Sequence, residues 1–118
     1  MFSEAVLDHF KNPRNAGDLP NASATVEVSN PVCGDILRLA ARIENGIIAE
    51  VRFKAQGCVT SIASSSIVTE LIRGKSLSEV RGFTAKEISE ALGGLPAATF
   101  HGAQLAADAV AALVAQLR

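Results

Sequence analysis

The spacing between apolar residues differs between the two halves of the chain. Over residues 24–28, 37–43 and 49–54, apolar and polar residues alternate, as they do in strands whose successive side chains point to opposite faces of a sheet. Asn45-Gly46 separates the second run from the third, and this pair favours a tight hairpin because both residues tolerate positive φ. The pattern predicts a three-stranded antiparallel meander with one face exposed to water.

Apolar residues recur at helical spacing on both sides of this region. A short helix is predicted over residues 3–11, and it ends at Asn12-Pro13 because the residue before proline avoids the α region. A second helix is predicted over residues 59–73, with Gly74 ending it. A last helix is predicted from about residue 102 to residue 116.

Two capping boxes mark further helix starts, one formed by Ser76 with Glu79 and the other by Thr84 with Glu87. A sheet followed by helices predicts an α+β fold, and the 118 residues suit one domain, 1–118.

The helix over residues 59–73 carries two features of its own. Ile62, Ile67 and Leu71 lie near one stripe, and Ala63 and Ser66 are interpreted as small close-packing positions. The run Ser64-Ser65-Ser66 is interpreted as a polar helix face or a close-packing surface, because the chain lacks a Gly-x-Ser-x-Gly elbow that would make a serine a nucleophile.

Charge and composition exclude two classes of partner. Eleven Lys and Arg against twelve Asp and Glu leave a formal charge of −1, so neither nucleic acid nor an anionic membrane surface is expected as a partner. The longest apolar run, 109–115, is too short to span a bilayer. Glu4 and Asp8 stand where a signal peptide would be basic, so we expect a cytoplasmic protein.

Four residues with metal-binding side chains lie at loops or helix ends: Cys33, Asp35, Cys58 and His101. Cys33 and Asp35 are two positions apart and share a face if the segment is extended. Cys58 lies at a helix N-terminus, which favours the thiolate over the thiol. Sulfur, oxygen and nitrogen ligands of this kind suit a tetrahedral zinc or iron site.

Each residue also has a plainer interpretation. Asp35 follows glycine in a common turn pair, Cys58 is of a type often buried in cores, and His101 at a helix start is often solvated. His9, in the first helix, is assigned a structural role or a contact with a partner.

An ordered set of motifs in this chain resembles the IscU/NifU N-terminal family of iron–sulfur cluster assembly scaffolds. The set is Phe2-Ser3-Glu4, 8–17, Cys33-Gly34-Asp35, 53–58, 62–66, Thr69-Glu70, Gly74-Lys75, and Leu95-Pro96 before His101. The resemblance implies an IscU/SufE-like fold, a three-stranded antiparallel sheet with helices packed on it. It also implies a transient [2Fe–2S] cluster, a cysteine desulfurase as partner, and Cys33, Asp35, Cys58 and His101 as the residues that bind the cluster or a metal.

The chain departs from the family pattern at two places. Where the family has cysteine after the histidine, this chain has Gly102, which can neither bind iron nor accept sulfur. Where the family has Leu-Pro-Pro-Val-Lys, a segment read by an Hsp70-type chaperone, this chain has residues 95–99, Leu-Pro-Ala-Ala-Thr. Recognition by that chaperone is therefore expected to weaken, because a charge and a fixed backbone angle are lost.

Three hypotheses follow for a protein that is not expected to be an enzyme. In the first, the chain is a scaffold for iron or a labile cluster, as a monomer or a weak homo-oligomer whose chains pool their cysteines. In the second, motivated by Gly102, it is a non-assembling paralogue that binds Zn²⁺ and docks a desulfurase or another partner as a regulator. In the third, only the fold is kept and both thiols are buried without a metal.

Overall fold

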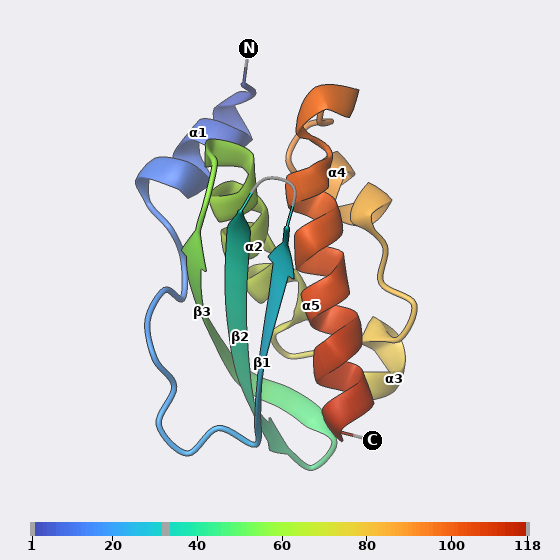
Figure 1. Ribbon diagram of the computed structural model, residues 1–118. Coiled ribbons are helices and arrows are strands. Elements are labelled where there is room, and N and C mark those ends of the chain that lie inside the picture. Colours follow the sequence, from blue (N-terminus) through green and yellow to red (C-terminus); the bar gives the residue numbers. More distant parts are fainter. Residues whose placement is uncertain (1, 32–33, 118) are drawn as a thin grey trace.

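A computed structural model describes residues 2–31 and 34–117, and the described residues form one antiparallel sheet with helices against one side (Figure 1). Its strands are β1 (Ala24–Asn30), β2 (Asp35–Glu44) and β3 (Ile47–Gln56), in the order β1-β2-β3. Both pairs of neighbours are antiparallel. The predicted meander and the α+β fold are confirmed.

The register of the strands separates an apolar face from a charged one. Leu39 in β2 lies opposite Val26 in β1 and Phe53 in β3, and both Leu39 and Phe53 are buried. The neighbouring residue of β2, Arg38, points to the other face, where it lies opposite Glu27 in β1 and Lys54 in β3. This alternation is the expected consequence of burying one side of a sheet.

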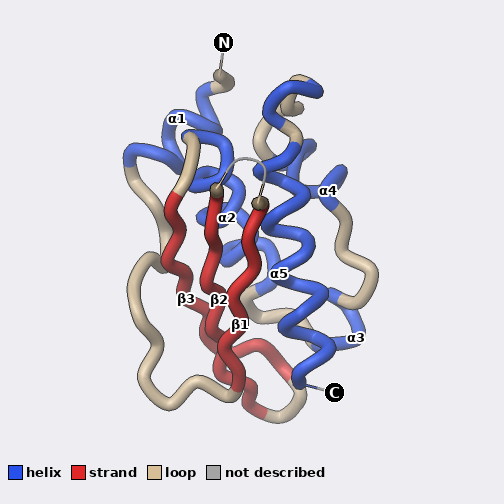
Figure 2. Tube along the Cα trace, in the orientation of Figure 1, coloured by secondary structure: helices blue, strands red, loops and turns tan. Residues whose placement is uncertain are grey.

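The helices cover the apolar face (Figure 2). They are α1 (Glu4–Lys11), α2 (Val59–Ile72), α3 (Leu77–Val80), α4 (Ala85–Ala91), the short 3₁₀ helix η1 (Ala97–Thr99) and α5 (His101–Leu117). Helix α2 contacts β3, α5 contacts β1 and β2, and α1 packs against α2. In the described part of the chain, no helix combines the length and apolar character needed to cross a membrane.

The local signals at turns and helix starts act as predicted. Asn45 and Gly46 have φ values of 54° and 76°, which form the tight hairpin between β2 and β3. Both capping boxes are present: at the starts of α3 and α4 the cap hydroxyl and the glutamate carboxylate each accept a hydrogen bond from a backbone N–H group. Gly74 follows α2 with a φ of 85°.

In helix α2 the residues of the apolar stripe are not the most buried ones. Ile62, Ile67 and Leu71 are only half-buried, whereas Ser64 and Val68 are fully enclosed. The reason is that α1, α4, α5 and β3 all contact α2, so small side chains are needed on several sides to let these elements approach. The serine run is therefore a close-packing surface.

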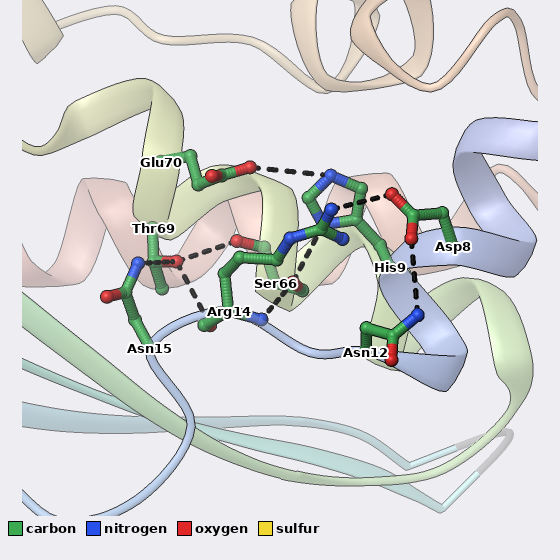
Figure 3. A network of polar contacts seen from close by, with 8 residues as sticks. All are labelled: Asp8, His9, Asn12, Arg14, Asn15, Ser66, Thr69 and Glu70. Atoms are coloured by element: carbon green, nitrogen blue, oxygen red, sulfur yellow. Dashed lines mark hydrogen bonds and ion pairs between the residues drawn. The ribbon is translucent and has the colours of Figure 1, made fainter.

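A polar network fastens α1 and the segment after it to α2 (Figure 3). The Arg14 amide donates to Ser66 Oγ at 2.8 Å, and Ser66 Oγ lies 2.7 Å from His9 Nδ1. Glu70 Oε1 lies 3.4 Å from His9 Nε2, and a carboxylate can only accept, so the neutral ring of His9 carries its proton on Nε2. His9 Nδ1 then accepts the proton of Ser66 Oγ.

The surroundings of His9 lower its pKa below the ordinary 6.5. Burial is the largest cause, followed by the positive charge of Arg14, while Glu70 and Asp8 act in the opposite direction. His9 therefore favours the neutral form in the folded protein. Its interpretation as a structural residue is supported by its position between α1 and α2.

We predict that stability decreases as pH falls below 6.5 towards the lowered pKa of folded His9, because in that interval the unfolded chain binds the proton more readily. Below the folded pKa this contribution to the pH dependence ends. Urea unfolding at a series of pH values measures it. The slope in this interval should shrink in a His9→Gln variant and persist in a matched His101→Gln variant; an unchanged slope in His9→Gln would contradict the assignment.

Candidate functional site

Three of the predicted ligand residues are brought together by the topology of the sheet and two helix starts. Ile36 pairs with Gln56, so the start of β2 and the end of β3 lie at the same end of the sheet. This places Asp35 beside Cys58. Cys58 is the N-cap residue of α2, and His101 is the first residue of α5. Figure 1 shows the start of β2, the end of β3 and the starts of α2 and α5 at the end of the molecule where α1 lies.

The three side chains converge on a small volume. One ligand atom from each of Asp35, Cys58 and His101 can be chosen so that all lie within 4.8 Å of one another. His101 Nε2 lies 3.4 Å from Cys58 Sγ and 3.6 Å from Asp35 Oδ2, and Cys58 Sγ lies 3.7 Å from Asp35 Oδ2. A thiolate, a carboxylate and an imidazole at these separations suit Zn²⁺ or iron.

The exposure of the three residues is graded. Asp35 is buried, His101 is half-buried, and Cys58 is exposed as a free thiol. The site therefore has a buried carboxylate at its base and a sulfur that solutes and partners can reach.

Gly57 is required for the approach of Asp35 to Cys58. A Cβ at position 57 would overlap the Asp35 carboxyl group, and the φ of Gly57 is 155°. Only glycine meets both conditions without strain. The Gly57-Cys58 pair thus couples the end of β3 to the start of α2.

The environment of Cys58 lowers the pKa of its thiol below the ordinary 9.0. Partial burial, the largest single contribution, raises this pKa, but it is outweighed by hydrogen bonds from the Ser61 backbone amide, the Thr60 hydroxyl and His101. Hydrogen bonds to the charged form stabilise the thiolate, which is the form that binds metals and acts as a nucleophile.

Gly102 is buried at a direct contact between the backbones of two helices. A Cβ added at this position would lie 2.8 Å from the Ser61 nitrogen and 2.9 Å from the Thr60 carbonyl oxygen. Because these are backbone atoms, no rotation of a side chain can relieve the overlap. The place where the resemblance leads us to expect a third cysteine is therefore filled by the first turn of α2.

The geometry decides some of the interpretations that the sequence left open. Asp35 is the first residue of β2 and lies with Cys58 and His101 in the converging group, and Cys58 is exposed and therefore not a core cysteine. Cys33 lies outside the described residues, so its part in the site stays a prediction.

Sequence reasoning missed the hydroxyl groups of Thr60 and Ser61, which both lie 3.2 Å from Cys58 Sγ. The signal was present in the sequence. Hydroxyl residues two and three positions after a residue that caps a helix share the first turn with it, where they can reach its side chain.

Comparisons with known proteins confirm the resemblance. The NifU-like N-terminal domain family matches residues 1–118. The chain is 42% identical over 121 residues to the iron–sulfur cluster assembly scaffold protein IscU of Escherichia coli K12, covering 99% of this chain and 94% of the relative. It is also 42% identical over 110 residues to IscU 1 of Archaeoglobus fulgidus, covering 93% and 72%.

Solved structures show the same fold. A NifU-like N-terminal protein from Brucella abortus superposes with a TM-score of 0.76 at 20% identity, covering 98% of this chain and 92% of that one. A protein described as a scaffold for the SUF system, from Fervidobacterium islandicum, gives a TM-score of 0.75 at 22% identity, covering 96% of each chain.

We predict that Gly102→Ala destabilises the protein. In an open helix position alanine is more favourable than glycine by about 1 kcal/mol, but overpacking against fixed backbone costs about 1–3 kcal/mol. Urea unfolding measures the sum. Gly102→Cys should destabilise at least as much, because it adds a larger side chain at the same contact.

The matched control is Gln104, an exposed residue of the same helix. Comparing Gln104→Ala with Gln104→Gly gives the helix propensity alone, and the alanine variant should be the more stable. The same preference for alanine at position 102 would show that the close approach of α5 to α2 is not required.

Proposed function

Because this chain belongs to the NifU-like N-terminal domain family, we propose that it is a scaffold on which iron–sulfur clusters are assembled. The observation that carries the proposal is the convergence of Asp35, Cys58 and His101. These residues supply a thiol, a carboxylate and an imidazole, and the chain is 42% identical to IscU proteins over most of its length. Together the two observations favour an iron site over a chance grouping of side chains.

The cargo of the site is iron, a transient [2Fe–2S] cluster, or Zn²⁺. We propose Cys33 as the fourth ligand residue, because it precedes Asp35 by two positions and the start of β2 directs Asp35 to the site. Two thiolates, a carboxylate and an imidazole supply four donors, the number that tetrahedral Zn²⁺ takes.

The sulfur of a cluster requires a donor, and a cysteine desulfurase is the partner that we propose. The protein acts in the cytoplasm, as a monomer or a weak homo-oligomer, and supplies a binding surface without turning over a substrate as an enzyme. Docking of an Hsp70-type chaperone at residues 95–99 is expected to be weak. Ala97 and Ala98 are exposed there, and the uncharged Thr99 stands where the family motif has lysine.

One observation favours a second candidate function. The backbone contact at Gly102 leaves no room for a third thiol between α2 and α5. A protein with only two thiols still meets the needs of Zn²⁺. The second candidate is thus a non-assembling paralogue that binds Zn²⁺ and docks a desulfurase or another partner as a regulator.

The first prediction for this function concerns anaerobic reconstitution with a cysteine desulfurase, cysteine and ferrous iron. The protein should bind iron and develop visible sulfur-to-iron charge-transfer absorption. Cys58→Ala and His101→Ala should lose most of both, whereas Ser64→Ala, a buried change that lies outside the triad, should retain them. A colourless wild-type protein without iron would reject the scaffold function.

A second measurement separates the two candidates. The regulator should contain Zn²⁺ as purified and retain a desulfurase in a pull-down, yet carry no transferred sulfur. Mass spectrometry of the protein after incubation with desulfurase and cysteine provides the test. A persulfide on Cys33 or Cys58 would refute the regulator and support the scaffold.

A further inference from the structure

Two hydroxyl groups surround the sulfur of Cys58 on the side of α2. Thr60 Oγ1 and Ser61 Oγ each lie 3.2 Å from Cys58 Sγ, and both residues are 1% exposed. Ser61 Oγ also contacts Asp35 Oδ2 at 2.5 Å. One buried turn of helix therefore touches two of the three converging ligand residues.

The directions of these hydrogen bonds follow from the number of protons available. A carboxylate only accepts, so Ser61 donates its single proton to Asp35 Oδ2. The proton of Thr60 can rotate towards Cys58 Sγ, and a thiolate can only accept it. Ser61 is thus oriented to Asp35, and Thr60 is the hydroxyl available to the thiolate.

The positions of both hydroxyls are fixed by the backbone rather than by a metal. The start of α5 packs on the Thr60–Ser61 peptide at Gly102, and Ser65 Oγ donates to the Ser61 carbonyl at 2.7 Å. The turn is therefore held by contacts within the protein itself. Groups held in this way orient ligands at little cost in entropy.

We propose that Thr60 and Ser61 are positioning residues of the metal site, in which Thr60 donates a hydrogen bond to the Cys58 thiolate and Ser61 holds the Asp35 carboxylate. The inference rests on the function proposed above. It assigns to these residues the orientation of two ligands and the tuning of the sulfur, since a hydrogen bond lowers the electron density that the thiolate offers to a metal.

The test uses Co²⁺ as a probe in Thr60→Val, which keeps the shape but removes the hydroxyl, and in Thr60→Ser, which restores it. Thr60→Val should weaken Co²⁺ binding about 10–100-fold and move the sulfur-to-cobalt charge-transfer band to lower energy. Thr60→Ser should recover both. Ser61→Ala should weaken binding by a similar factor with a smaller shift of the band, because it acts mainly through Asp35.

Ser64→Ala is the matched control. Ser64 is buried in the same helix, and its hydroxyl has no hydrogen-bond partner among the described residues, so its removal should change neither affinity nor band. A purely structural role of Thr60 would lower stability in Thr60→Val without moving the band. Wild-type affinity and band in both Thr60→Val and Ser61→Ala would overturn the proposal.

A measurement without metal separates failure of this inference from failure of the proposed function. Alkylation of Cys58 in the metal-free protein, at a pH high enough to ionise the thiol fully and followed by mass spectrometry of its peptide, should be faster in Thr60→Val than in wild type or Thr60→Ser, because a thiolate that has lost a hydrogen bond is the stronger nucleophile. If wild type binds no Co²⁺ but this order holds, the proposed function fails and the hydroxyl contact stands. Equal rates in all three proteins would overturn the contact.

Discussion

The first turns of α2 and α5 meet backbone to backbone at Gly102, and the spacing between Cys58 and His101 depends on that contact. Cys58 belongs to the start of one helix and His101 to the start of the other. Any side chain at position 102 must separate the two turns. The residue at which this chain departs from the family pattern therefore also sets how closely the start of α5, which carries His101, approaches the start of α2.

Helix α2 can carry the site rigidly because it is enclosed by other elements. Enclosing a helix that is rich in serine and threonine costs least where the hydroxyls find partners, and every buried hydroxyl of α2 except that of Ser64 has one. Ser65 donates to the Ser61 carbonyl, Thr69 donates to the Ser66 carbonyl, and Ser66 meets His9 and Arg14. The same network joins α1 to α2, the helix whose N-terminus presents Cys58. Helix α2 therefore both anchors α1 and positions the thiol.

Local signals in the sequence were sufficient for most of the fold, whereas contacts between distant segments were not. The Asn45-Gly46 turn and both capping boxes act within a few residues, and the structure confirms them. The convergence of Asp35, Cys58 and His101 was predictable because each lies at an element end. The burial of α2 on several sides, and the overlap that a side chain at position 102 would cause, arise from packing between elements that are far apart in the sequence. The spacing of apolar residues does not report such packing. For this reason the stripe at Ile62, Ile67 and Leu71, which is half-buried, does not reveal how fully Ser64 and Val68 are enclosed.

The group formed by Asp35, Cys58 and His101 combines internal hydrogen bonds with exposure to solvent. Asp35 is buried and already hydrogen-bonded to Ser61, so a cation would gain an oriented carboxylate with little rearrangement of the chain. Cys58 is exposed, so a partner can reach the sulfur directly. A storage or structural metal site is better served by enclosing all of its ligands, which excludes water and competing ligands. A buried carboxylate combined with an exposed thiol instead suits a cargo that must be both held and released, which is the requirement that an assembly scaffold has to meet.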